Sequence, residues 1–260
     1  MEHITSKDGT MIGFRRSGTG PGLLFVHGIT ADHMSWSKIS PRFEEYFTVY
    51  AMDRRGRGGS GDSPDYNFMR EVEDIVALLE SIGEPVNLFG HSLGGLLCLE
   101  AALLSDKIGR LMLYEPHVPN IGPPTPADLP YQIQALIDQG KLEAAMLLFL
   151  REAAGMQDEE IQVYRELPLW QARLPLAPTI PREMQVDRTF SFDASKYAKL
   201  WVPTLLLLGG ESPPFSQQAV QIVATALPNS RVVILPGQQH MAHHTNPDLF
   251  FEEVLRFLLA

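Results

Sequence analysis

The ten residues VNLFGHSLGG, residues 86–95, decide the fold and point to its chemistry. An apolar run leads into a G-x-S-x-G pattern, and a second apolar run, residues 96–104, follows it. In this order of strand, sharp turn and helix, Ser92 would project its hydroxyl away from a sheet, and glycine at 90 and 94 would relieve crowding around the turn. The Leu93 N–H would lie at a helix N-terminus, directed at the oxygen that becomes negative when Ser92 attacks a carbonyl. The pattern therefore predicts a serine nucleophile.

Six short apolar runs along the chain predict buried strands. Each has about four residues and most are flanked by Gly, Pro or Asp, as in strands covered on both faces of a parallel sheet. Amphipathic helical patterns lie between or after them, at residues 72–82 and 250–258. This alternation predicts an α/β fold with a doubly wound, mostly parallel sheet. The six runs are residues 23–26, 49–52, 86–89, 111–114, 205–208 and 232–235.

The alternation stops in residues 117–199, which are rich in proline and have helical patterns without strands, most clearly at 141–154. A long helical insertion between two strands suggests a cap, or lid, over the sheet edge where open α/β sheets bind ligands. We expect a core formed by residues 1–116 and 200–260, with the cap, 117–199, inserted after the sixth strand. Apolar cap residues would either line a hydrophobic substrate site or pack the cap on itself. Those assigned to the site are Met146, Phe149 and Trp170.

The GHSLGG motif, an earlier His27-Gly28 pair and a late histidine together resemble the α/β-hydrolase superfamily, in particular its serine esterase-like and lactonase-like members with a helical cap. The resemblance implies that the Ile29 N–H joins the Leu93 N–H in an oxyanion hole, with Gly28 allowing close approach of the backbone. It also implies that His240, which follows the Pro-Gly after the last apolar run, is the general base.

Four further histidines are expected to have roles other than that of the general base. His91, next to the nucleophile, is assigned to substrate binding, and His27 to structure. His243 and His244 are the nearby rivals of His240, and we expect them at the surface or at the rim of the pocket.

Two carboxylates compete for the role of the triad's acid. Most members of the superfamily carry an aspartate just past the strand that follows the cap, but Ser212 stands at that position here and cannot carry the charge. Glu115 ends the run before the cap, a position that some members use, whereas Glu211 lies one residue from the usual place. We favour Glu115, because a strand end holds a side chain rigidly and residue 211 should point the other way.

The segment DRRGRGGS, residues 53–60, resembles another loop of the superfamily. Its glycines and arginines could suggest a phosphate cradle, but it lacks the Gly-Lys-Ser/Thr ending of such loops and does not run directly into a helix. We interpret it as an element that shapes a loop and does not bind an anion.

Composition limits the partners and the location. A formal charge of −10 argues against nucleic acid and anionic membranes, which select basic surfaces. The single cysteine excludes an internal disulfide and, with a polar N-terminus, fits a cytoplasmic protein. No metal is expected, since His240, His243 and His244 have no supporting Cys or carboxylate cluster, and no cofactor is implied. The expected partner is a small-molecule substrate, and the C-terminal helix leaves a homodimer possible.

Three functions fit this pattern. The first is hydrolysis of a carboxylic ester or lactone of a small, mainly hydrophobic substrate through an acyl-enzyme. The second uses the same triad for C–C bond hydrolysis or for cofactor-free, haloperoxidase-like perhydrolysis. The third is a ligand-binding receptor on a hydrolase scaffold, because a fold alone does not fix function.

Overall fold

Eight strands form one sheet in the order β1-β2-β4-β3-β5-β6-β7-β8 in the computed structural model, which describes residues 1–123 and 125–260. Neighbours from β4 to β8 in this order are parallel, and β2 is antiparallel to both β1 and β4. The strands are β1 (Glu2–Thr5), β2 (Met11–Ser17), β3 (Gly22–Val26), β4 (Thr48–Met52), β5 (Val86–His91), β6 (Ile108–Tyr114), β7 (Thr204–Gly209) and β8 (Ser230–Leu235). The predicted α/β, doubly wound and mostly parallel sheet is confirmed. The prediction missed β1, an edge strand without a buried residue, and β2 beside it, which mixes exposed residues with buried ones.

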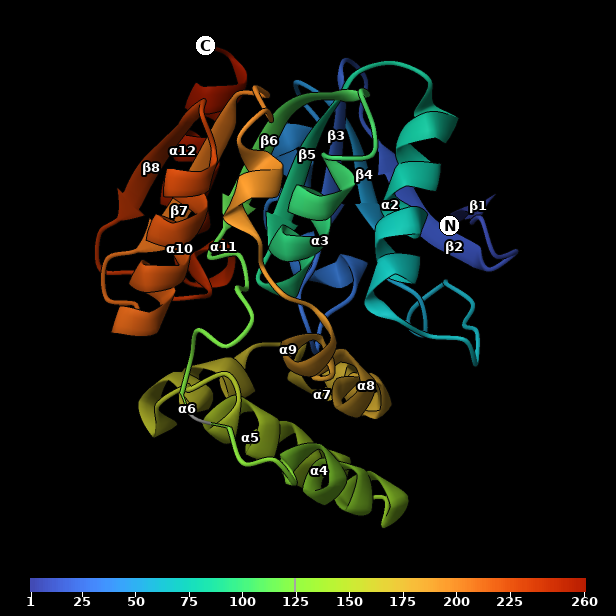
Figure 1. The fold of residues 1–260 in the computed structure, drawn as a ribbon, viewed down its shortest axis with the longest axis vertical. Coiled ribbons are helices and arrows are strands. Elements are labelled where there is room, and N and C mark those ends of the chain that lie inside the picture. The colour runs from blue at the N-terminus through green and yellow to red at the C-terminus, as the bar shows by residue number, and fades with distance from the viewer. Residues whose placement is uncertain (124) are drawn as a thin grey trace.

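Helices cover both faces of the sheet, which explains why its strands read as continuous apolar runs. In β3, Leu24 and Val26 face the layer that holds α2, α3 and α10, while Leu23 and Phe25 face the layer that holds α1 and α12. Figure 1 shows α2, α3 and α10 in front of the sheet. These helices are α1 (Ser40–Phe43), α2 (Phe68–Ile82), α3 (Leu93–Ala101), α10 (Pro214–Ala226) and α12 (Pro247–Leu258).

The segment between β6 and β7 forms a separate helical layer at one end of the sheet (Figure 1). It has an apolar core of its own, to which Met241 of the main domain contributes. Residue 124, inside the predicted cap, lies outside the described residues. The helices of this layer are α4 (Leu129–Asp138), α5 (Leu142–Glu152), α6 (Asp158–Glu166), α7 (Trp170–Arg173), α8 (Ile180–Glu183) and α9 (Val186–Thr189), with the 3-10 turn η2 (Leu174–Thr179). The 3-10 turn η3 (Ala194–Tyr197), which leads to β7, packs on the main domain through Tyr197.

Buried ion pairs join the arginine-rich loop after β4 to the helical layer. Arg54 binds Glu71 through two hydrogen bonds of 2.6 and 2.7 Å, and its Nη2 also lies 3.2 Å from Glu183 at the end of α8. Arg57 pairs with the same Glu183 carboxylate. Arg55 binds Asp74. Each guanidinium of this loop is thus paired with a carboxylate of the protein, which agrees with a loop-shaping element.

Glu183→Gln should lower the free energy of unfolding by about 3–5 kcal/mol, because it leaves two buried guanidinium groups with an incomplete set of carboxylates. Chemical denaturation monitored by circular dichroism measures the change. The matched control is Asp62→Asn, which breaks the exposed pair with Arg182 at the same junction and should cost less than about 1 kcal/mol. Equal effects of the two substitutions would show that the buried cluster does not fasten the helical layer to the core.

Candidate active site

Ser92 sits at a strained turn between β5 and α3. Its φ of 55° and ψ of −123° place a residue with a side chain in a region that favours glycine. The neighbouring backbone leaves no room for side chains on either side: a Cβ at Gly94 would lie 2.5 Å from two carbonyl oxygens of β3 and the following loop, and one at Gly90 would lie 2.5 Å from the Gly94 oxygen. The turn therefore requires the two glycines and holds Ser92 half-buried at the wall of a cavity of about 570 Å³.

His240 lines the same cavity and is bound to a buried carboxylate. Its Nδ1 lies 2.7 Å from Oε2 of Glu115, the residue directly after β6. The other oxygen, Oε1, accepts hydrogen bonds from the Gly209 N–H, at 2.8 Å, and from the Ser212 hydroxyl. Glu211 is exposed. Of the two candidate acids, the structure brings Glu115 to His240, and the serine at the superfamily's usual acid position now supports that carboxylate.

Two backbone amides next to Ser92 have no hydrogen-bond acceptor among the described residues. They belong to Ile29 and Leu93, and both residues line the cavity. Gly28 lies against the nucleophile, since a Cβ there would be 2.9 Å from the Cβ of Ser92. Free N–H donors beside a nucleophilic hydroxyl are what an oxyanion hole requires. The arrangement can thus supply a nucleophile, a base held by an acid, and two donors.

Comparison with known proteins shows the family to which the chain belongs. The model of the alpha/beta hydrolase family matches residues 23–253. The chain belongs to this family. A solved alpha/beta hydrolase from Sphaerobacter thermophilus is 32% identical and superposes with a TM-score of 0.89 over 99% of this chain and 100% of that one.

Two curated relatives cover nearly the whole chain. N-formylmaleamate deformylase from Pseudomonas putida is 27% identical, over 94% of this chain and 91% of its own length. A 2-(acetamidomethylene)succinate hydrolase from Mesorhizobium japonicum is 25% identical, over 95% of this chain and 91% of its own. Both are hydrolases by name, and their names point to different substrates.

Electrostatics in this alpha/beta hydrolase prepare His240 to accept a proton. Burial works to lower the pKa of His240, but the hydrogen bond and charge of Glu115, together with the charge of Glu160, outweigh it and raise the pKa. Burial works to raise the pKa of Glu115, yet the hydrogen bonds from His240 and Ser212 lower it. The acid therefore stays ionised, and its charge favours the imidazolium that forms when His240 takes a proton.

Glu160→Gln should move the acid limb of the pH profile of kcat/KM to lower pH. His240 must be neutral to act as a base, so activity falls as the pH drops through its pKa, which lies above the ordinary value of 6.5. Removing the Glu160 charge lowers the pKa of His240, so the enzyme should stay active at lower pH. Glu159→Gln, on the exposed side of the same helix, is the control and should leave the limb in place. A limb that moves equally in both variants, or in neither, would contradict the role given to Glu160.

The loop that carries His240 is fixed from the sheet. The Tyr114 hydroxyl at the end of β6 donates to the Gln239 oxygen and accepts from the Ala242 N–H at 3.0 Å. Nε2 of His91 lies 2.9 Å from the His240 oxygen. Burial and the nearby His240 keep the pKa of His91 well below its ordinary value, so His91 is neutral and donates this bond. His91 thus positions the base loop, besides lining a small cavity behind Ser92.

The predicted cap contacts need correction. Phe149 lines the cavity, but Met146 and Trp170 do not. Both are buried in the core of the helical layer, where Trp170 packs edge-on against Tyr164. Helical periodicity gives an apolar face but does not say which part of it meets a cavity. His243 and His244 were expected at the surface or at the rim of the pocket. Both are buried, and His243 lines the small cavity behind Ser92.

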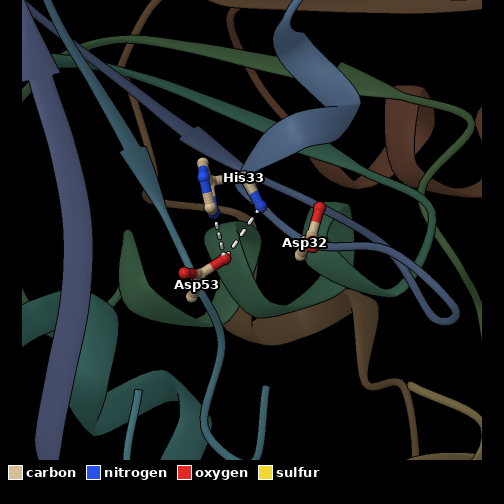
Figure 2. Close-up of side chains that lie close together, drawn as sticks. All are labelled: Asp32, His33 and Asp53. Carbon is tan, nitrogen blue, oxygen red and sulfur yellow. Dashed lines mark hydrogen bonds and ion pairs between the residues drawn. The ribbon is translucent and has the colours of Figure 1, made fainter. Parts of the chain in front are cut away.

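Asp53 anchors the loop after β3, which carries Ile29. It follows β4, and its Oδ1 accepts from both the N–H and the Nδ1 of His33, at 2.9 and 2.8 Å (Figure 2). Its Oδ2 accepts from the Gly59 N–H. Asp32 lies close enough that it could share a metal ion with Asp53 and His33, but its Oδ1 already accepts from the Met34 N–H. These bonds explain the cluster as a structural junction between two loops.

Sequence reasoning missed Glu160, which reaches the cavity from α6. Helix α6 begins with three acidic residues, as a solvent-exposed helix N-terminus commonly does. No pattern in the sequence separates the carboxylate that faces His240 from its exposed neighbours, because the difference arises only when the helical layer docks on the core.

Proposed function

We propose that this alpha/beta hydrolase cleaves a carboxylic ester or lactone through an acyl-enzyme intermediate. The observation that carries the proposal is the 2.7 Å hydrogen bond from His240 to a buried carboxylate, in a cavity that Ser92 also lines. A histidine whose Nδ1 is bound in this way presents Nε2 to a nucleophile and takes its proton without leaving its place.

The mechanism follows from the positions of these groups. The Ser92 oxygen adds to the carbonyl carbon while its proton passes to Nε2 of His240. Glu115 stabilises the resulting imidazolium, and the Ile29 and Leu93 amides hold the oxyanion. The proton then passes to the leaving oxygen as the C–O bond breaks, which leaves the acyl group on Ser92. A water molecule, deprotonated by His240, releases the acid and restores the serine.

The cavity supports a small substrate with a mainly hydrophobic body. At about 570 Å³ it falls in the range of small-molecule sites. Apolar side chains from the helical layer and the core form much of its wall, among them Ile121, Phe149, Met156, Met184 and Phe215.

Cleavage of an acyl C–N bond is a second candidate. The names of the two curated relatives describe hydrolysis of N-acyl compounds, a formyl and an acetamido compound. The same serine, histidine and amides would act on such a bond, with the leaving nitrogen taking the proton from His240. C–C bond hydrolysis and perhydrolysis use the same groups and remain alternatives for the test.

A substrate panel tests the proposal. Wild type and Ser92→Ala are compared on p-nitrophenyl esters of rising acyl length, small lactones, N-formyl and N-acetyl amides, and a 1,3-diketone, with peroxide added in a parallel set. We expect Ser92-dependent hydrolysis of esters or lactones. Turnover of the amides alone would favour the second candidate. Turnover of the diketone alone, peroxide-dependent products alone, or no Ser92-dependent product would contradict the proposal, and the last result would favour a receptor.

A further inference from the structure

A second, smaller cavity adjoins Ser92 on the side of the buried histidines. Its volume is about 60 Å³, which holds a few water molecules or one carboxylate. Ser92, His240, Ile29 and Phe149 line both this cavity and the large one, so a bound molecule can reach into both. Both cavities have an arginine in their walls, but Arg188 of the large cavity is exposed, whereas Arg173 of the small cavity is buried.

Arg173 is a buried cation without a counter-ion. It ends helix α7, only 4% of its surface is exposed, and no carboxylate of the described residues pairs with it. Its Nη2 donates to the Ser35 hydroxyl at 3.2 Å and to Nε2 of His244 at 3.0 Å, both neutral acceptors. Its hydrogen bonds with the described residues come from Nη2 alone, so Nε and Nη1 make none.

This arrangement differs from that of the other buried arginines. Arg54, Arg55 and Arg57 each pair with at least one carboxylate of the protein. Leaving a charge buried and unpaired costs stability. The Tyr164 ring, whose centroid lies 4.7 Å from Cζ of Arg173, offsets part of this cost, and a carboxylate of a bound molecule would supply the missing counter-charge. Burial lowers the pKa of Arg173 to about 10, and the side chain therefore remains charged at neutral pH.

We propose that Arg173 binds a carboxylate group of the substrate in the small cavity, so that the preferred substrates are acyl compounds with a carboxylate a few bonds from the scissile carbonyl. This inference rests on the proposed function, because it uses the same Ser92. The planar guanidinium has two unused donors, and an arginine fork binds a carboxylate through parallel hydrogen bonds. The acidic residues Glu160 and Asp187 line the large cavity. Its arginine, Arg188, is exposed and already donates to the Ala127 oxygen, so the small cavity is favoured for the charged end.

Matched esters test the assignment. Monomethyl succinate and monomethyl glutarate are compared with the corresponding methyl esters in which a neutral carboxamide replaces the carboxylate. In wild type, kcat/KM should favour the carboxylate over the amide by about 100-fold, and in Arg173→Gln this ratio should fall toward 1. Arg173→Lys keeps the charge but loses the fork and should give an intermediate ratio. Arg151→Gln, which removes an exposed arginine of α5, is the control and should keep the wild-type ratio.

The outcomes separate this inference from the proposed function. Suppose hydrolysis depends on Ser92, but the ratio of kcat/KM for the carboxylate ester to that for the carboxamide ester is near 1 in wild type or is unchanged in Arg173→Gln. This result overturns the carboxylate site and leaves the proposed hydrolase function intact. If neither esters nor lactones are turned over, the proposed function fails and binding decides: succinate, but not succinamide, should raise the Tm of wild type and not that of Arg173→Gln. An equal shift in both proteins, or none in wild type, overturns the site. If Arg173→Gln does not fold, Arg173→Lys takes its place in both comparisons.

Discussion

Replacing Ser92 with alanine should lower kcat by about a million-fold on any ester or lactone that the wild type hydrolyses. The expected loss is large because the serine, the histidine and the acid act as a unit, and without the hydroxyl no acyl-enzyme can form. The catalysis that remains in Ser92→Ala comes from binding of the substrate and from the two free amides at Ile29 and Leu93. Initial rates with a sensitive fluorogenic ester measure the difference.

Ser216→Ala is the matched control for this substitution. Ser216 lines the same cavity from α10 but makes no hydrogen bond with Ser92, His240 or Glu115 among the described residues, so its loss should change kcat only a few-fold. A Ser92→Ala protein that folds normally and keeps a tenth or more of the activity would remove Ser92 from the chemistry. It would also leave the strained turn at residue 92 without a function.

Glu115→Gln should lower kcat by about 10,000-fold, comparable to the loss known for removing the charge of a triad acid. The amide keeps the shape of the side chain but cannot stabilise the imidazolium, and it can present an N–H to Nδ1 and so favour the wrong tautomer. Because the Glu115 charge raises the pKa of His240, the acid limb of the remaining activity should also move to lower pH. Glu211→Gln is the control and should lose little, since that side chain is exposed.

A double variant sharpens this test. The Ser212 hydroxyl already donates to the Glu115 carboxylate, so an aspartate at 212 would bring a charge to the same place by another route. Glu115→Gln combined with Ser212→Asp should recover part of the activity that Glu115→Gln loses. A larger loss in Glu211→Gln than in Glu115→Gln would contradict the assignment of the acid.

The core of the site was predictable because its requirements are local. Ser92 and its two glycines form one turn, and the need for glycine follows from the backbone contacts of that turn. Glu115 could be favoured over Glu211 because the end of a buried strand fixes the direction of a side chain. The sheet was predictable for a similar reason, since strands covered on both faces must be apolar throughout.

The rest depends on how the helical layer docks on the core, and no local pattern encodes that. Met146 and Phe149 share one helix and one apolar face, yet only Phe149 reaches the cavity. In the sequence Glu160 and Arg173 look like ordinary charged residues. Only the tertiary structure places them in the cavities that Ser92 and His240 line. Strand β1 was missed because an edge strand with exposed polar residues resembles a loop. Strand β2, between β1 and β4, was missed because its buried stretch is short and is followed by two exposed arginines.

The most direct test of the central claim, that Ser92 is an activated nucleophile, is labelling with a fluorophosphonate followed by intact-mass measurement and peptide mapping. We predict one adduct per chain, on the peptide that contains Ser92, formed at a rate that falls as the pH drops through the raised pKa of His240 and that Glu115→Gln strongly reduces. No adduct on the folded protein, or an adduct on any other residue, would contradict the account.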